Sequence, residues 1–268
     1  MSTWDELGFL SDEAERDALA SCRNNPKSVI PAFRLAKHLH ERLNEFKPQA
    51  GNLRHLVSSL ILTRALSLYE GIILLSLRGM RPESEVLLRA LLEMMFMQAA
   101  VRRQPETAEH LVKSDDDQRV KLFRGILNTV TDAEKPKVLA SATRGLEEAE
   151  ARLAGHGVKG LAVAELAKRG GLSNLYETVY RVLSLPTHGQ LRDLEDYVRR
   201  GEASDPSIIN WGPDHPAAKQ TNVSAMAMLI EIAEHFAAVV GADLGSEWSA
   251  IRESLTSLQS RLPDAPHD

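Results

Sequence analysis

Cysteine is almost absent from this chain, which has a single one, Cys22, in 268 residues. One thiol cannot form an intramolecular disulfide, and it cannot supply a multi-cysteine metal site. Aromatic residues are also scarce, at 5%, whereas leucine and alanine are abundant. Because strands favour aromatic and β-branched side chains, this composition favours helices.

Acidic residues outnumber basic ones, 37 to 32, which leaves a formal net charge of −5. Such a chain has no general attraction to nucleic acid, so contact with RNA needs a local basic patch. The acidic N-terminus has no basic segment followed by an apolar run, which predicts no signal peptide. Arg64 and Glu70 interrupt the apolar region 56–77, so no stretch reaches the roughly 18 uncharged apolar residues of a transmembrane helix. We expect a cytoplasmic protein with no membrane partner.

Motifs that bind metals or phosphates are missing as well. None of the nine histidines has a glutamate three positions before it, and H-E-x-x-H, Walker A and G-x-S-x-G patterns do not occur. Residues 155–160, GHGVKG, match G-x-G-x-x-G in letters but follow a charged helical pattern instead of a strand. We interpret them as a flexible turn between helices, and we expect no cofactor and no metal ion.

Apolar residues recur at helical spacing over most of the chain. Ser11 is placed to cap a first helix, Pro82 opens a later one, and Gly79 ends the helix before it. The pattern predicts a short strand at 208–211 and helices at 11–24, 28–46, 50–78, 82–103, 115–130, 132–153, 172–185, 189–199, 217–240 and 246–260.

The segment 82–103 is apolar on all sides, and a helix of that kind must be enclosed by others. We therefore predict an all-α fold, a multi-helix bundle around a fully buried central helix. Residues 104–171 are strongly charged and interrupted by glycines, which predicts a polar helical lobe. The expected organisation is a single all-helical domain, 1–268, with its core at 28–103 and 172–260, the lobe at 104–171 and a disordered tail at 261–268.

Two charges interrupt the central apolar segment. Between Val86 and Val101 the only charged residues are Arg89 and Glu93, four positions apart and therefore on one helix face. Arginine before glutamate is the weaker order for pairing along a helix, so surface pairing explains them poorly. An unpaired buried charge is costly, so each needs a nearby partner. Two interpretations stay open: a structural buried ion pair, or a role in or behind a functional site.

A second polar cluster follows at Tyr180, Arg181, Ser184 and His188. Arg181, Ser184 and His188 lie opposite the apolar stripe of the predicted helix, and Pro186 is expected to end or kink it. A histidine beside an arginine and a hydroxyl fits an acid–base group with a fixed cation nearby. The alternative is an ordinary solvated helix face. We expect the two clusters to converge on one water-poor pocket.

Two further features have ordinary explanations. Glu231, Glu234 and His235 lie together on a late predicted helix, and we interpret them as a hydrated or core-edge cluster. Trp211 lies in a loop bounded by proline and glycine, where it either caps a pocket or anchors the loop against the core.

On these residues the chain resembles an uncharacterised family of all-helical bacterial proteins, a domain of unknown function. The resemblance rests on Arg89-x-x-x-Glu93 and on Tyr180-x-x-x-Ser184-x-x-x-His188, and it covers roughly residues 50–200. It implies a helical fold and brings no settled activity with it.

A looser similarity is to the HEPN superfamily of helical domains. Many of its members are metal-independent RNases of toxin and antiphage systems, and they use an arginine followed by four to six residues and a histidine. Six residues separate Arg181 from His188 here. The similarity implies that His188 moves a proton, that Arg181 stabilises charge on phosphorus, and that Tyr180 and Ser184 position the substrate. It also implies RNA at a local basic patch, a homodimer with the site across its interface, and an antitoxin or other regulatory partner.

In this hypothesis Arg89 and Glu93 hold the site from behind. The competing hypothesis is a non-catalytic helical module, in which the same residues form a buried network that sets helix register or binds a small anion. One observation separates the two. In an enzyme, Arg181 and His188 line an open, positively charged cleft; in a module, they are enclosed and bonded to Arg89 or Glu93.

Overall fold

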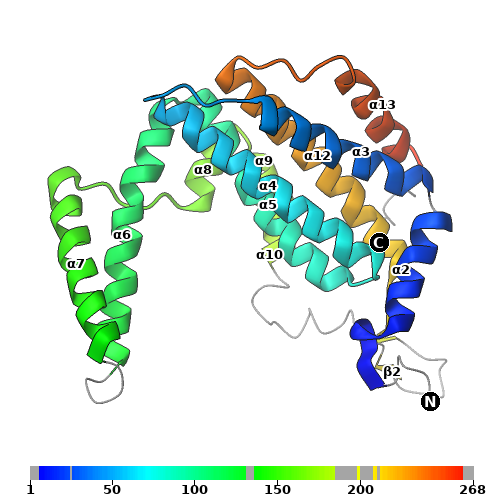
Figure 1. Cartoon of the computed structure of the whole chain (residues 1–268), viewed down its shortest axis with the longest axis horizontal. Helices are drawn as coiled ribbons and strands as arrows, with labels where there is room; N and C mark the ends of the chain where they lie inside the picture. Colours follow the sequence, from blue (N-terminus) through cyan, green and yellow to red (C-terminus); the bar gives the residue numbers. More distant parts are fainter. Residues whose placement is uncertain are drawn as a thin grey trace.

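The computed structural model of the chain describes residues 6–24, 26–130, 136–184, 198–199, 208–209 and 212–261. Helices account for most of them and pack together (Figure 1), which confirms the predicted all-α fold. The exception is a pair of two-residue strands, β1 (Val198–Arg199) and β2 (Ile208–Ile209), which pair antiparallel. The strand predicted at 208–211 is therefore found at its first two positions, and Trp211 lies outside the described residues.

The chain begins with a short 3-10 turn, η1 (Gly8–Leu10), and two helices, α2 (Asp12–Asn24) and α3 (Pro26–Glu45). Ser11 caps α2 as expected, because its hydroxyl accepts a hydrogen bond from the backbone N of Ala14 at 3.1 Å. Three acidic residues in the first turn of α2 lie at its positive end. α3 contributes Val29, Ala32, Leu35 and Leu39 to the main core.

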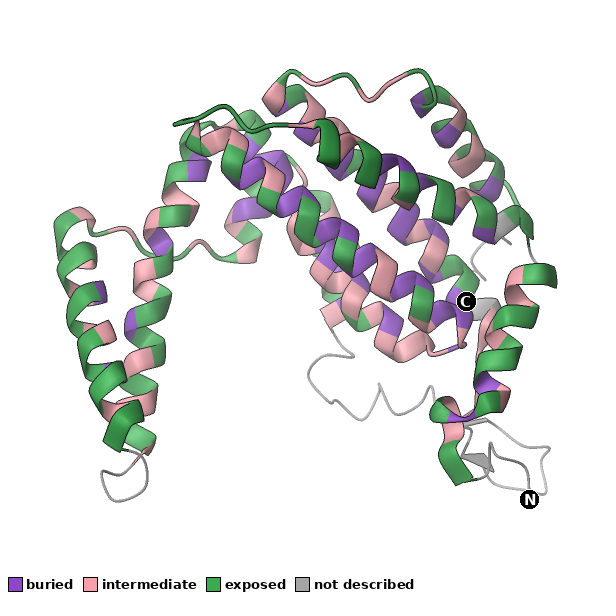
Figure 2. Cartoon of the chain, in the orientation of Figure 1, coloured by how far each residue is buried: buried purple, intermediate pink, exposed green. Residues whose placement is uncertain are grey.

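Three long helices form the core: α4 (Leu53–Leu77), α5 (Arg81–Arg103) and α12 (His215–Val240), which pack against one another. Buried residues concentrate on them (Figure 2). The last helix, α13 (Trp248–Gln259), contacts α12 and α3. The largest fully buried side chains come from these five helices: Tyr69, Phe96, Leu35, Leu39, Leu62, Ile72, Leu91, Leu92, Met226, Leu229, Ile232 and Ile251.

The turn between α4 and α5 depends on Gly79. Its φ of +73° lies in the left-handed region, and its backbone N donates to the carbonyl of Ser76 at 3.0 Å, which ends α4. The carbonyl of Gly79 accepts from the backbone N of Asp214 at 2.9 Å and so ties the turn to the start of α12. A Cβ at this position would lie only 2.5 Å from Pro213, so conformation and packing both require glycine.

α5 lies at the centre of the bundle, but it is not enclosed on every side as predicted. α4, α8 and α12 pack against it and bury its apolar residues. Val86, however, is 38% exposed, and the side chains of Arg89 and Glu93 are 20% and 31% exposed. The prediction is wrong at this face because the two charges keep part of their hydration, which avoids much of the cost of burying them.

Two core helices are long and apolar enough to cross a bilayer by length and mean hydropathy, although charged residues interrupt both of them, so the expectation about uncharged stretches holds. The segments are Leu53–Leu77 and Ala218–Val240, each with a mean hydropathy of 1.7. More than half of each apolar stretch is buried inside the protein, so packing in the core explains the hydrophobicity. The arrangement is consistent with a soluble protein.

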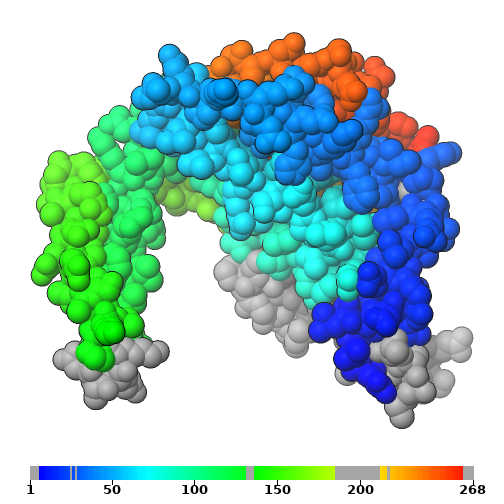
Figure 3. Space-filling view, in the orientation of Figure 1, coloured from blue at the N-terminus to red at the C-terminus, as the bar shows by residue number. Residues whose placement is uncertain are grey.

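α6 (Glu106–Thr129) and α7 (Pro136–His156) form a helical hairpin. The start of α6 packs against α4 and α5, and the rest of the hairpin projects from the body (Figure 3), with an open hollow between hairpin and body. Few residues of this hairpin are buried, and those on α7 are the small Ala142 and Ala149. The next helix, α8 (Val163–Gly170), packs against α5 instead. The region predicted as a polar lobe, 104–171, thus contains a projecting hairpin and a helix of the body.

The helix predicted at 172–185 consists of three consecutive segments: α9 (Ser173–Leu175), the π-helical turn η2 (Tyr176–Tyr180) and α10 (Arg181–Ser184). Residues 185–197 lie outside the described part, as does the predicted tail from residue 262 onward. The helix predicted at 189–199 is wrong at its last two residues, because Val198 pairs with Ile209 in the small sheet, a setting that suits β-branched side chains.

Candidate functional site

The charge pair of α5 meets the second predicted cluster at Tyr180. The tyrosine hydroxyl donates to Oε1 of Glu93 at 2.8 Å and accepts from Nη2 of Arg89 at 3.0 Å. Arg89 and Glu93 also form an ion pair, with 3.6 Å between Nε and Oε1. One polar network of these three residues, the Tyr180 network, therefore joins α5 to η2.

Aromatic rings flank this network. The ring of Tyr176 stacks on that of Tyr180, with centroids 5.1 Å apart, and Phe96 lies 6.4 and 6.0 Å from the two. The guanidinium carbon of Arg89 lies 5.1 Å from the centroid of the Tyr180 ring, a cation–π contact. Burial raises the pKa of the Tyr180 hydroxyl, and the hydrogen bond from Arg89 partly opposes this shift. The phenol is therefore protonated at neutral pH and able to donate to Glu93.

Arg181 lies outside the Tyr180 network. Its side chain is 65% exposed and forms an ion pair with Glu177 at 2.8 Å. The hydroxyl of Ser184 donates to the backbone carbonyl of Tyr180 at 2.7 Å, a bond within the helix itself. His188 lies outside the described residues. The structure thus brings Tyr180 to the charge pair of α5 and keeps Arg181 away from it, and the position of His188 stays a prediction.

A cleft of about 760 Å³ lies between α5, the η2–α10 segment and α12. At its polar end Arg81 pairs with Glu85 at 2.8 Å and approaches Asp214 at 4.0 Å. Glu177, the partner of Arg181, also lines the cleft. Among the described lining residues two are acidic and one is basic, so those residues alone do not provide a basic patch.

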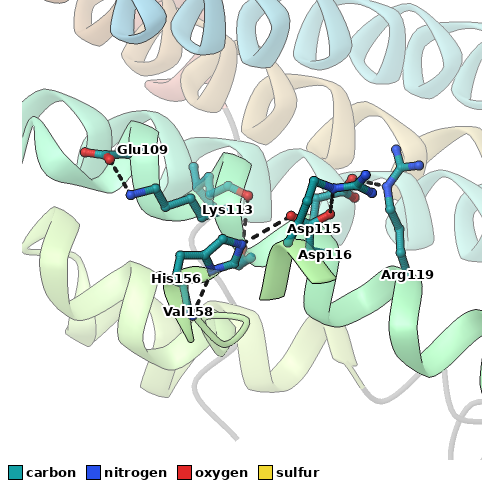
Figure 4. A network of polar contacts seen from close by, with 10 residues as sticks. Glu109, Lys113, Asp115, Asp116, Arg119, His156 and Val158 are labelled. Atoms are coloured by element: carbon teal, nitrogen blue, oxygen red, sulfur yellow. Dashed lines mark hydrogen bonds and ion pairs between the residues drawn. The ribbon is translucent and has the colours of Figure 1, made fainter. Parts of the chain in front are cut away.

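The glycine-rich loop at 155–160 is held by carboxylates of α6 (Figure 4). Asp116 accepts a hydrogen bond from Arg152 at 2.8 Å and pairs with His156 at 3.2 Å. The hydrogen bond from Arg152 is the main cause of the lowered pKa of Asp116. The backbone N of Val158 donates to Nδ1 of His156 at 3.0 Å, and that of Gly160 donates to the next carboxylate of α6 at 3.2 Å. The loop connects α7 to α8, as expected of a turn, and these bonds tie it to the hairpin.

The late cluster of Glu231, Glu234 and His235 serves separate contacts. Glu234 accepts from Nε1 of Trp248 at 3.0 Å and pairs with an arginine of α13 at 3.0 Å, so it links α12 to α13. Nδ1 of His235 lies 2.8 Å from a guanidinium nitrogen of Arg102. Burial lowers the pKa of His235, and the charge of Arg102 adds to this effect. No group of three or more His, Cys, Asp or Glu side chains in the described part of the chain could hold a metal ion.

Sequence reasoning missed Tyr176, the π-helical turn and the contact between Arg102 and His235. The four-residue spacing of Tyr176 and Tyr180 was a usable signal, because residues four apart on a helix are neighbours. Nothing in the letters YETVY distinguishes a π-turn from an α-turn, although π-turns occur frequently at functional sites. The contact between Arg102 on α5 and His235 on α12 depends on how the two helices pack, which the sequence pattern does not show.

Comparison with known proteins identifies the family of this chain. A model described as a family of unknown function (DUF5677) matches residues 55–205, which include the whole Tyr180 network. The match covers more than half of the chain, so the chain belongs to this family, and the expected resemblance to an uncharacterised helical family is confirmed. No curated protein matches the chain, and no solved structure does.

Proposed function

We propose that this member of the DUF5677 family is a metal-independent RNA-cleaving enzyme of HEPN type that acts in a toxin or antiphage-defence system. The supporting observation is the position of Arg181. The residue before it is anchored to α5 by two hydrogen bonds to charged groups, while Arg181 itself is 65% exposed. A solvent-facing guanidinium on an anchored backbone is suited to a phosphate contact.

In this proposal His188 takes the proton from an RNA 2′-hydroxyl, whose oxygen attacks the adjacent phosphorus. The bond from phosphorus to the 5′ oxygen breaks, and the imidazolium returns a proton to that leaving oxygen. The products are a 2′,3′-cyclic phosphate and a 5′-hydroxyl. Arg181 stabilises the negative charge that develops on the phosphoryl oxygens. The chemistry proceeds through side chains of the protein, so it tolerates a chelator.

Arg181 must leave Glu177 before it can contact a phosphate. Both side chains are more than half exposed, at 65% and 55%. An exposed ion pair of this kind contributes about 0–1 kcal/mol, because water and salt screen it. Release of Glu177 therefore costs Arg181 little when a phosphate takes its place.

The Tyr180 network acts as positioning machinery in this scheme. Arg89 and Glu93 hold the helix that carries Arg181 from behind, and they do not touch the substrate. Ser184 uses its hydroxyl within the helix, so we assign it to positioning as well.

The proposal includes the partners and the location expected from the sequence. RNA binds at a local basic patch, because the net charge of −5 gives no general attraction. Two copies of the chain form a homodimer with the site across their interface. An antitoxin or other regulatory protein controls the activity, and the protein works in the cytoplasm.

A second candidate function is a non-catalytic helical module. It is favoured by the Tyr180 network, in which Arg89 and Glu93 direct their hydrogen bonds and their charges at each other and at Tyr180. A partly buried polar network of this kind can set helix register. This candidate explains the charge pair of α5 without any role for Arg181 or His188.

Incubation of the purified chain with mixed RNA in EDTA tests the proposal. We expect the parent protein to produce fragments that end in 2′,3′-cyclic phosphate. His188→Ala, which removes the acid–base group, and Arg181→Ala, which removes the charge that stabilises the phosphoryl oxygens, should each lose at least about a hundredfold in rate. Arg119→Ala and His40→Ala are matched controls. Arg119 pairs with a carboxylate four positions away, as Arg181 does, and His40 is an exposed histidine with a carboxylate partner.

Two outcomes contradict the proposal that the protein is an RNA-cleaving enzyme. Cleavage that persists in both site variants shows that the activity belongs to a contaminant or to other residues. If no protein in the series cleaves RNA while all of them are folded by circular dichroism, the helical module is favoured.

A further inference from the structure

A second hollow lies farther along α12 than the cleft, toward the C-terminal end of that helix. It has a volume of about 470 Å³ and lies between α5, the α9–η2 segment and α12. We call it the α12 cavity. Its walls are mainly apolar, and the described apolar residues that line it are Leu92, Met95, Leu172, Leu175, Val179, Val223, Ala227 and Met228.

The α12 cavity adjoins the larger cleft. Val179, Ser224 and Met228 line both hollows, so the two are neighbours along α12. Pockets that bind drug-sized ligands usually measure about 300–1,000 Å³ and are mainly apolar with a few polar groups, which describes the α12 cavity.

Apart from Ser224, the polar residues that line the cavity are Glu231, His235 and Gln259, and they lie toward one end of it. The guanidinium of Arg102 can only donate, so Nδ1 of His235 accepts from it and the neutral imidazole carries its hydrogen on Nε2. Glu231 lies one helical turn before His235, is exposed, and forms no ion pair with the described residues. The end of the cavity thus offers one N–H donor and one carboxylate acceptor on the same face of α12.

We infer that the α12 cavity binds an apolar small molecule whose head is neutral and both donates and accepts hydrogen bonds, such as a carboxamide. The apolar body lies between α5, α9–η2 and α12, and the head lies at His235 and Glu231. The inference is independent of the proposed RNA cleavage, because it uses none of the residues assigned to that reaction.

Charged heads fit this end less well. An anionic head would accept from His235 but would face the carboxylate of Glu231. A cationic head would be attracted to Glu231 but would meet the N–H of His235, with the positive charge of Arg102 behind it. A neutral amide satisfies both groups without repulsion, so we expect a preference of about tenfold or more over either charged head, the change that one hydrogen bond to a charged group produces.

Three probes with the same body test this preference: 2-naphthamide, 2-naphthoate and 2-naphthylmethylamine. Binding to the full chain is followed by NMR of ¹³C-labelled methionine methyl groups, which report location as well as affinity. We expect 2-naphthamide to shift the methyl signals of Met95 and Met228, which line the cavity, and to leave that of Met80 unchanged. Binding that shifts neither cavity methionine overturns the inference, as does equal or tighter binding of a charged probe.

A pair of matched variants tests the site from the protein side. Ala227→Phe fills the cavity and should weaken 2-naphthamide binding by about tenfold or more, whereas Ala238→Phe places the same ring on an exposed position of the same helix and should have no effect. Ala227→Leu repeats the test if the larger residue prevents folding. His235→Phe should remove the preference for the amide head while naphthalene itself still binds. Equal binding by the two alanine variants overturns the inference, and failure of RNA cleavage does not affect it.

Discussion

Substitution of Tyr180 by phenylalanine is a direct test of the Tyr180 network. The change removes a single oxygen, which donates to Glu93 at 2.8 Å and accepts from Arg89 at 3.0 Å. The ring remains, so its stacking on Tyr176 and its contact with Phe96 are kept. The measured change in stability therefore reports the hydroxyl and its two charged partners.

The expected loss follows from the exposure of those partners. A hydrogen bond to a charged group contributes roughly 1.5–3 kcal/mol, and a buried group left unsatisfied costs a similar amount. The side chains of Arg89 and Glu93 are 20% and 31% exposed, so water can replace part of what the hydroxyl provided. We therefore expect Tyr180→Phe to lower the free energy of unfolding by about 1–2 kcal/mol, below the sum of two fully buried bonds.

Urea unfolding at pH 7, followed by circular dichroism, provides the measurement. Tyr176→Phe is the matched control, because Tyr176 stacks on Tyr180 and its hydroxyl makes no hydrogen bond with the described residues. It should change stability by less than about 0.5 kcal/mol. If Tyr180→Phe is as neutral as this control, the hydroxyl does not hold α5 to η2, and the positioning role of the network is refuted.

Alkaline titration adds a check on the same group. The pKa of Tyr180 is raised in the folded protein, mainly by burial. The stability that this shift provides is complete below the ordinary tyrosine pKa of about 10 and is lost as the pH rises through the folded value. The parent protein should therefore lose more stability above about pH 10 than Tyr180→Phe does.

Three further predictions concern other parts of the chain. The pKa of His235 lies below its ordinary value, so the stability that this histidine provides is lost as the pH falls through the folded pKa. Because the charge of Arg102 contributes to the shift, the substitution Arg102→Gln should raise the pKa of His235, which NMR of the imidazole measures. Gly170→Ala should lower the free energy of unfolding in urea by about 1–3 kcal/mol, because the new Cβ would lie 2.9 Å from a side chain of α5. Gly155→Ala is the control: its new Cβ would meet nothing within 4 Å, so the change should be neutral or slightly stabilising. Asp116→Asn should lower stability at pH 7 and flatten its loss on acidification, because the lowered pKa of Asp116 makes its contribution present above its ordinary pKa and absent in acid.

The long helices could be read from the sequence because their boundaries depend on neighbouring residues. Ser11 caps α2 through a contact three residues away, and Gly79 ends α4 through its own backbone conformation. The projecting hairpin was only partly foreseen. Thin apolar stripes indicated a polar region, but they did not show that α8, with Gly170 at its end, belongs to the body and packs on α5.

The charge pair of α5 shows what pattern alone leaves open. Two charges in an apolar segment required partners, and Tyr180 was already a candidate from the second cluster. Its link to Arg89 and Glu93 depends on how η2 packs against α5, which no local spacing determines. The exposure of Arg181 and its pairing with Glu177 also depend on that packing.

By itself the sequence determined that this protein is a bundle of helices with charges inside its most apolar segment, because helical periodicity and capping act over a few neighbouring residues. Tertiary structure alone decided which charges meet, which helix faces keep water, and where a cavity remains along α12. These depend on the relative positions of helices that are distant in the chain, where differences of a few ångströms decide whether two groups form a bond or leave a space.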